Sequence, residues 1–149
     1  MSIAKCQKQV SDSFIKVEEK SKKAVFKNAA RQIYFVTTVD GCLLKQQVAA
    51  DWVVSKKAVG DIIVELKGRD VEHGAKQIES TASYWEQENL RMGKLAGLLV
   101  CAQYPRASTM IQKCQQNFSR KYRGPLHVVT KNLEYRFEDV LSFKGPLRS

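Results

Sequence analysis

Three polar residues that could carry out hydrolysis lie close together in the middle of the chain: Asp51, Glu65 and Lys67. In an extended strand the side chains alternate between the two faces, so Glu65 and Lys67 project together. Asp51 belongs to the preceding apolar run, and a hairpin folded about Ala58 places it opposite Glu65. Side chains that face each other across such a hairpin have Cβ atoms about 5 Å apart. The parity of this register is the only one that puts all three polar side chains on one face.

Two carboxylates at this distance repel each other unless a divalent cation lies between them. The carboxylates of Asp51 and Glu65 and the main-chain carbonyl of Leu66 supply oxygen ligands of the kind that Mg²⁺ or Mn²⁺ prefers. The metal would polarise a phosphate oxygen and lower the pKa of a bound water. Lys67 would orient that water or stabilise the charge that grows on the phosphorus centre. These residues therefore predict phosphodiester hydrolysis with Mg²⁺ or Mn²⁺ as cofactor.

Hydrophobic periodicity predicts the elements that must position these residues. A first helix, capped by Ser11 and running to about Ala30, is predicted from apolar residues at helical spacing. Its stripe comprises Phe14, Val17, Ala24, Val25 and Asn28. Strands are predicted over residues 33–39, 49–54 and 61–67, followed by a helix capped by Asp70, a buried strand over 95–102, a helix from Ser108, a strand over 126–130 and an edge strand containing Leu133, Tyr135 and Phe137. The order α-β-β-β-α-β-α-β predicts one α/β domain over residues 1–149, a central mixed β-sheet flanked by helices.

The spacing of Asp51 and Glu65-Leu66-Lys67 across a hairpin resembles the PD-(D/E)XK nuclease superfamily, which includes restriction endonucleases and archaeal Holliday-junction resolvases. The motif covers residues 51–67, and the order of elements extends the resemblance to about residue 103. The resemblance implies a restriction-endonuclease-like fold, with Asp51 and Glu65 as metal ligands and Lys67 as the catalytic amine. The chain departs from the family pattern in having alanine, not proline, before Asp51.

The resemblance also draws attention to Glu18 and Gln77. In several branches of the superfamily a first-helix glutamate completes the metal site, and Glu18 lies at the edge of the predicted apolar stripe, whereas Glu19 points away. A plain surface acid is the alternative for Glu18. Gln77 shares a helix face with His73 and would hold a phosphate or a ligand carboxylate. One branch has Gln-x-x-x-Tyr at this place, where this chain has Gln77 and Thr81.

Two further acids, Asp61 and Asp40, are interpreted as turn residues with no part in catalysis. Asp61 lies on the same strand face as Glu65, but four residues separate them by roughly 13 Å, too far to share a metal. It is interpreted as a turn residue. Asp40 precedes Gly41 at the end of a predicted strand, where Asp-Gly is typical of a tight turn.

The net charge of +10 favours a polyanionic partner. Residues 1–31 carry +5 and residues 105–149 carry +6, whereas residues 32–104 carry −1. Both basic ends would grip nucleic acid, with DNA favoured over RNA, while the central acids bind metal. The cations proposed to contact nucleic acid, together with Tyr104, lie on or near the helix that begins at Ser108: Lys113, Arg120, Lys121 and Arg123. A solvated helix face explains the same cations almost as well.

The remaining composition indicates a cytoplasmic protein without a membrane span. The longest apolar runs have the length of strands, and the first ten residues lack the apolar stretch of a secretory signal. The four cysteines are scattered and contain no Cys-x-x-Cys pair, which predicts reduced thiols and neither a zinc site nor a disulfide framework.

The sequence thus predicts a small Mg²⁺-dependent nuclease, most plausibly an endonuclease on DNA. Because the chain is too short for a separate recognition domain, specificity would come from nucleic-acid shape, from a homodimer presenting two sites, or from a partner. One alternative is an inactive nuclease-fold protein that binds nucleic acid or a protein partner. Another is an unrelated α/β binding domain in which Lys67 simply pairs with Glu65 or Asp51.

Overall fold

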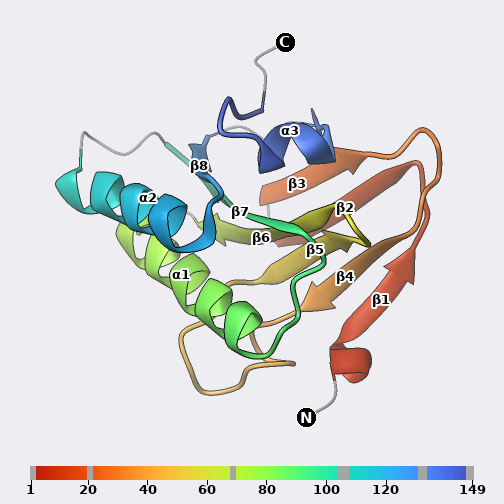
Figure 1. Ribbon diagram of the computed structural model, residues 1–149, viewed down its shortest axis with the longest axis horizontal. Coiled ribbons are helices and arrows are strands. Elements are labelled where there is room, and N and C mark those ends of the chain that lie inside the picture. Colours follow the sequence, from red (N-terminus) through yellow and green to blue (C-terminus); the bar gives the residue numbers. More distant parts are fainter. Residues whose placement is uncertain (1–2, 20–21, 68–69, 104–107, 131–133, 147–149) are drawn as a thin grey trace.

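A six-stranded mixed sheet forms the centre of the computed structural model, which describes residues 3–19, 22–67, 70–103, 108–130 and 134–146 (Figure 1). The strand order is β1-β4-β5-β6-β7-β8. The strands are β1 (Gln7–Val10), β4 (Tyr34–Thr38), β5 (Trp52–Lys56), β6 (Gly60–Lys67), β7 (Lys94–Cys101) and β8 (Leu126–Val129), and a 3-10 turn, η1 (Ile3–Cys6), precedes β1. The pairs from β1 to β6 are antiparallel, and β6, β7 and β8 are parallel. The sheet is therefore mixed, as the sequence predicts.

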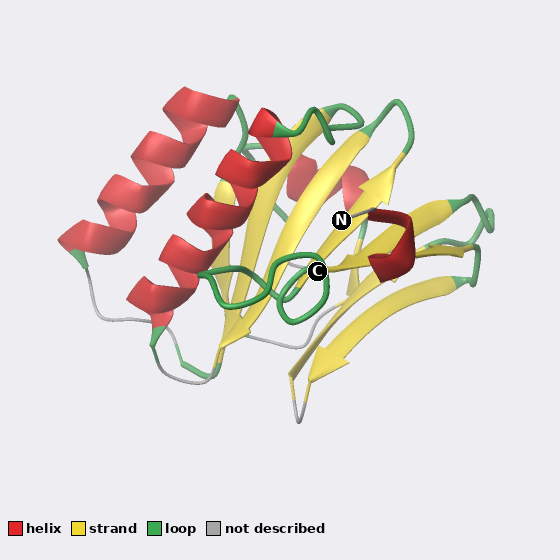
Figure 2. Cartoon of the chain, turned by 90° about the horizontal axis from the view of Figure 1, so that it is seen from below, coloured by secondary structure: helices red, strands yellow, loops and turns green. Residues whose placement is uncertain are grey.

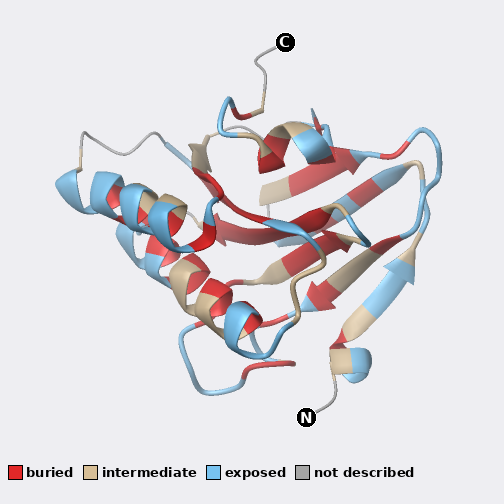
Figure 3. Cartoon of the chain, in the orientation of Figure 1, coloured by how far each residue is buried: buried red, intermediate tan, exposed pale blue. Residues whose placement is uncertain are grey.

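Two helices, α1 (Val71–Gln87) and α2 (Thr109–Tyr122), cover one face of this sheet (Figure 2). Both begin at predicted caps: the Asp70 carboxylate accepts the main-chain N–H of His73 at 3.0 Å, and the Ser108 hydroxyl accepts that of Ile111 at 3.2 Å. Such caps satisfy N–H groups that have no partner within the helix. The inward side chains of α1 are buried, and the largest of them, Trp85, is 1% exposed. The two helices and the sheet enclose one hydrophobic core (Figure 3).

The opposite face carries a small second sheet and a short helix. The second sheet has the order β2-β3-β9, with β2 (Phe14–Glu19), β3 (Lys22–Lys27) and β9 (Glu134–Tyr135), and the helix is α3 (Phe137–Leu141). The inward side chains of the second sheet are Ile15 and Val17 of β2 and Phe26 of β3, and each is 4% exposed or less. They pack against the β6 side chains that face away from α1. A second core therefore lies between the two sheets.

The predicted helix from Ser11 to Ala30 is wrong, because these residues form the antiparallel β2–β3 hairpin. The predicted helical stripe relied on spacings of three, four and seven residues. The same segment also contains apolar residues two apart, Ile15 with Val17 and Ala24 with Phe26, which is the spacing of one strand face. A hairpin buries both pairs on one face, and packing against the large sheet decides between the two periods. The buried Asn28 belongs to no apolar stripe, since its side chain binds main-chain groups at the base of the hairpin.

The predicted C-terminal edge strand is also only partly correct. Tyr135 lies in β9, but Phe137 begins α3, and Leu133 lies outside the described residues. The acids Glu138 and Asp139 occupy the first turn of this helix, where they interact favourably with the helix dipole. The α/β class with a mixed sheet is thus confirmed. The first helix of the predicted order is wrong, the later elements are present up to β8, and the edge strand expected after β8 is only partly present.

Two of the four cysteines form a disulfide, Cys6–Cys42, across a sequence separation of 36 residues. Cys101 and Cys114 are free and buried. The prediction of reduced thiols is therefore wrong for one pair, and this removes the argument for a cytoplasmic location that rested on it, because disulfides persist mainly in oxidising compartments.

Within the described ranges, none of the helices combines the length and the apolar character needed to cross a membrane.

A candidate active site at the β5–β6 hairpin

The predicted hairpin register is confirmed. Strand β5 pairs with β6 symmetrically about Ala58, from Lys56 opposite Gly60 to Trp52 opposite Val64. Ala58 adopts the left-handed conformation, with φ of 65°, at the tip of the turn. The residues next in line are Asp51 and Glu65, and at this point the two strands cease to pair.

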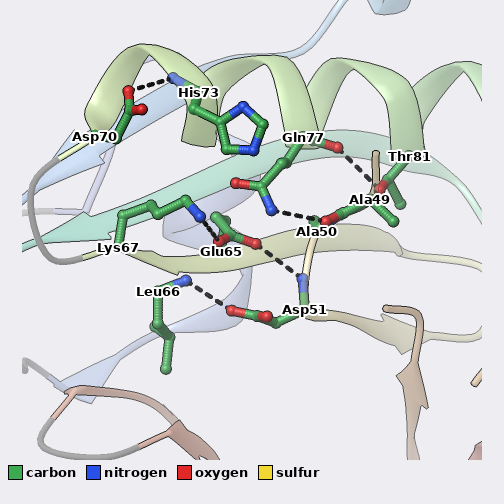
Figure 4. Close-up of polar contacts among 10 residues, drawn as sticks. All are labelled: Ala49, Ala50, Asp51, Glu65, Leu66, Lys67, Asp70, His73, Gln77 and Thr81. Carbon is green, nitrogen blue, oxygen red and sulfur yellow. Dashed lines mark hydrogen bonds and ion pairs between the residues drawn. The ribbon is translucent and has the colours of Figure 1, made fainter. Parts of the chain in front are cut away.

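Beyond the paired segment, the two acidic side chains bind the opposite main chain crosswise. The N–H of Asp51 donates to Oε1 of Glu65 at 3.0 Å, and the N–H of Leu66 donates to Oδ2 of Asp51 at 3.1 Å (Figure 4). Figure 4 shows Glu65 and Lys67 pointing toward α1, while the Asp51 carboxylate lies beside the main chain of Leu66. Beyond Trp52 and Val64, the carboxylates of Asp51 and Glu65 accept the main-chain N–H groups in place of main-chain carbonyls. The strands separate at this point.

Lys67 lies alongside Glu65, with Nζ 3.5 Å from Oε2. The Glu65 side chain is 2% exposed and that of Lys67 is 24% exposed, so the acid is buried and the amine reaches solvent. Burial, and then the charge of Asp51, raise the pKa of Glu65 to about 8, because Lys67 offsets these two effects only in part. Near neutral pH the folded chain therefore holds a proton on Glu65 that a bound cation would displace.

The pKa of Asp51 is raised as well, first by burial and then by the charges of Glu19 and Asp40, and lowered by the N–H of Leu66 and by Lys67. Glu19 and Asp40 are thus near the site, although the sequence interpretation gave neither a role there. The alternation of β2 explains Glu19: the buried residues Ile15 and Val17 place it on the inward side of the strand.

Glu18, which the predicted helix put at the edge of the apolar stripe, lies on the outer side of β2. It is 3.5 Å from Nζ of Lys16, and both side chains are about half exposed. The structure therefore does not bring Glu18 to the pair formed by Asp51 and Glu65. The alternation of side chains in a strand, and not the spacing of a helix, is the signal in the sequence that points to Glu19.

Two residues of α1 fix the main chain that leads into Asp51. Nε2 of Gln77 donates to the carbonyl of Ala49 at 3.0 Å, and the N–H of Ala50 donates to Oγ1 of Thr81 at 2.8 Å. The Thr81 hydroxyl in turn donates to the carbonyl of Gln77 at 3.0 Å. The residue pair noted as a departure from the family pattern thus positions the first acid of the motif.

Gln77 also offers an acceptor to the site. The residue is 8% exposed, and its Oε1 is a buried oxygen without a hydrogen-bond partner among the described residues. In Figure 4 this oxygen points toward the space beside Lys67 and His73. An unpaired buried acceptor is costly, so a donor on a ligand would relieve it. The predicted interaction of Gln77 with a phosphate or ligand carboxylate would use its amide nitrogen, which donates one of its two N–H groups to the Ala49 carbonyl and keeps the other.

The cations predicted to contact nucleic acid are exposed but are not gathered at this site. Gly124, the residue after Arg123, packs so closely on Leu95 that an added Cβ would collide with its carbonyl oxygen. Leu95 is the second residue of β7, and β7 runs parallel to β6, so this region lies at the opposite end of the sheet from Lys67. The exposed set comprises Lys113, nearer the start of α2, and Arg120, Lys121 and Arg123 at its end. Tyr104 falls outside the described residues.

Asp61 has a structural role separate from the site. It is fully buried in β6, and its carboxylate accepts hydrogen bonds from Ser55 Oγ at 2.6 Å, the main-chain N–H of Met92 at 2.7 Å and Trp85 Nε1 at 3.2 Å. Burial raises its pKa. The interpretation of Asp61 as a turn residue is therefore wrong. Its partners are all different from those of Glu65, which agrees with the prediction that the two acids do not share a metal.

The donor set available to a metal comprises the Asp51 and Glu65 carboxylates and the carbonyl of Leu66. No group of three or more His, Cys, Asp or Glu side chains is arranged to hold a metal ion in the part of the chain that the structure describes. The buried Glu65 and the half-buried Asp51, both with raised pKa values, nevertheless have the chemistry that suits a hard divalent cation. No family model, curated protein or solved structure matches the chain, so the function is argued from this geometry.

Proposed function

We propose that the protein is a metal-dependent nuclease of the PD-(D/E)XK type, an endonuclease acting on DNA in preference to RNA. The observation that carries the proposal is the contact of Asp51 with Glu65 just beyond the end of the β5–β6 ladder, with the Lys67 ammonium 3.5 Å from Glu65. Burial raises the pKa of both acids, and the charge of Asp51 also raises the pKa of Glu65; a divalent cation would remove the cost of ionising them.

In this proposal each residue has a distinct part. Asp51, Glu65 and the Leu66 carbonyl would hold Mg²⁺ or Mn²⁺, which when bound supplies a polarised phosphate and an acidified water. Lys67 is charged, partly exposed and next to the ligand carboxylate, which suits a group that orients the attacking water or stabilises charge on the phosphate. Gln77 and Thr81 keep Asp51 in place through Ala49 and Ala50.

The net charge of +10 supports a polyanionic substrate. The described chain consists of this one sheet and its covering layers, so a homodimer that presents two sites is part of the proposal for an enzyme that cuts both strands of a duplex.

A second candidate function is that of a nuclease-fold protein that binds nucleic acid or a protein partner without cutting. The observation that favours it is that every charged group of the site has a partner within the chain: Asp51 binds Leu66, and Glu65 binds both Asp51 and Lys67. A site satisfied in this way holds together without a metal.

A cleavage assay with matched variants separates the two candidates. The protein is incubated with plasmid, single-stranded and branched DNA and with RNA, each with Mg²⁺, with Mn²⁺ or with EDTA. The nuclease proposal predicts metal-dependent cleavage that is lost in Glu65→Gln and in Lys67→Ala and retained in Glu18→Gln, a glutamate on the outer face of β2. Retarded migration of nucleic acid with no cleavage under either metal would favour the second candidate.

A further inference from the structure

The outer face of the β2–β3 hairpin combines an exposed aromatic ring with cations. Phe14 is 51% exposed although its neighbour Ile15 is fully packed, at 2%. Lys27 lies directly opposite Phe14 in the hairpin register, and directly paired side chains are about 5 Å apart on the same face. Lys16, two residues along β2 from Phe14, is also on this side and exposed. These three residues, called here the outer hairpin face, present a ring flanked by two ammonium groups.

The base of the hairpin is held rigidly, which keeps this ring in place. The buried Asn28 side chain donates from Nδ2 to the carbonyls of Asp12 at 2.9 Å and Gln32 at 2.8 Å, and its Oδ1 accepts the N–H of Gln32 at 2.9 Å. The N–H of Asn28 donates to the carbonyl of Ser13 at 2.7 Å, next to Phe14. An exposed Phe on a fixed strand loses little conformational entropy when a ligand packs on it.

The other end of β2 leads to the candidate active site. Glu19 is the last residue of β2, and its charge raises the pKa of Asp51. Five residue steps along the strand separate Phe14 from Glu19, a distance of roughly 17 Å. A nucleic-acid strand on the outer hairpin face would therefore turn around this end of β2 to reach the proposed catalytic residues, because Glu65 and Lys67 point toward α1 on the far face of the large sheet.

We propose that the outer hairpin face binds a single-stranded segment of nucleic acid, with a base stacked on Phe14 and phosphates on Lys16 and Lys27. The inference rests on the proposed nuclease function and adds its substrate class: nucleic acid with unpaired nucleotides beside the bond to be cut. An aromatic ring stacks on a base only when the base is not already stacked and paired within a duplex, and such stacking tolerates any sequence.

The charges of this face fit the same occupant. The ion pair between Lys16 and Glu18 joins two half-exposed groups at 3.5 Å, and pairs of this kind contribute little to stability. Lys16 can therefore exchange Glu18 for a phosphate at small cost. Residues 1–31, which contain the hairpin, carry a net charge of +5, the sign that a polyanion requires.

The test is a binding measurement in EDTA, where metal-dependent cleavage does not occur. Fluorescence anisotropy follows a labelled single strand and the corresponding duplex as the full-length protein is added. Phe14→Ala is compared with Phe143→Ala, which removes another exposed phenylalanine, 62% exposed, from the C-terminal segment. The double variant Lys16→Gln/Lys27→Gln is compared with Lys57→Gln/Lys94→Gln, which removes two exposed lysines from the end of the large sheet opposite Lys67. Urea unfolding of each variant verifies that the fold is unchanged.

We expect Phe14→Ala to weaken binding of the single strand by at least about fivefold, the effect of losing one stacked base, and to leave duplex binding nearly unchanged. Lys16→Gln/Lys27→Gln would lower the dependence of single-strand affinity on salt, because fewer counterions are released. Both control variants would bind like the unaltered protein. Equal affinities of Phe14→Ala and Phe143→Ala, or equal loss for single strand and duplex, would overturn the inference. Binding at this face without any cleavage in Mg²⁺ would instead refute the nuclease function alone.

Discussion

The buried Glu65 makes the stability of the protein depend on pH in a particular direction. Its pKa is about 8 in the folded chain, against the ordinary value of 4.5. Between these two pH values the folded protein holds a proton that the unfolded chain releases. The free energy of unfolding therefore falls as pH rises through this window, by up to about 1.4 kcal/mol per pH unit for one group.

The variant Glu65→Gln isolates this effect, because glutamine resembles the protonated acid in shape and does not titrate. Asp51 and Asp61 also have raised pKa values, and His127 has a lowered one, so the unaltered protein alone would give a mixture of contributions. Urea unfolding of both proteins in EDTA at a series of pH values gives the difference in unfolding free energy. We expect the unaltered protein to lose stability relative to Glu65→Gln as pH rises from about 4.5 to 8.

Adding Mn²⁺ should reverse the trend, because a cation that binds only the folded, ionised site stabilises it increasingly as the proton leaves. A difference that stays flat, or that grows in favour of the unaltered protein with rising pH, would show that Lys67 keeps Glu65 ionised. That result would refute the proposal that burial and the charge of Asp51 keep Glu65 protonated in the absence of metal.

Substitutions at three further places test the clamp on the site and the stability of the rest of the fold. Thr81→Val leaves the buried N–H of Ala50 without its acceptor and should lower the unfolding free energy by about 1–3 kcal/mol and weaken metal binding, whereas Thr81→Ser should restore both; equal behaviour of the two variants would argue against this clamp. Asp61→Asn places an amide where the carboxylate accepts from three donors, and it should lower the unfolding free energy by a similar amount, as measured by thermal unfolding. Metal-dependent cleavage should survive at a temperature at which the variant is folded. Replacing Cys6 and Cys42 together by serine should lower the unfolding free energy by about 2–4 kcal/mol, and an unchanged urea midpoint would contradict the disulfide.

The centre of the fold could be predicted from the sequence because its information is local. The turn about Ala58 and the alternation of β6 fix a hairpin register that places Asp51 level with Glu65, and the structure has that register. Asp70 likewise marks the start of α1 through a bond to a residue three positions away. Short-range patterns of this kind are decided by neighbouring residues and need no knowledge of the rest of the chain.

The features that could not be predicted depend on contacts between distant segments. The residues of β2 and β3 fit a helical stripe as well as a strand pair, and only the apolar face of β6 that they cover selects the hairpin. That choice reverses the roles of Glu18 and Glu19. The Cys6–Cys42 bond and the contact of Thr81 with Ala50 join residues more than 30 positions apart, and no local pattern indicates either one.

The claim at the centre of this account is that Asp51 and Glu65 bind one divalent cation together. Calorimetric titration of the protein with Mn²⁺ at pH 7 and at pH 8.5 tests it most directly. We expect one ion per chain, proton release on binding, tighter binding at the higher pH, and loss of binding in Asp51→Asn and in Glu65→Gln but not in Glu18→Gln. Binding that survives both substitutions, or no binding at either pH, would contradict the claim.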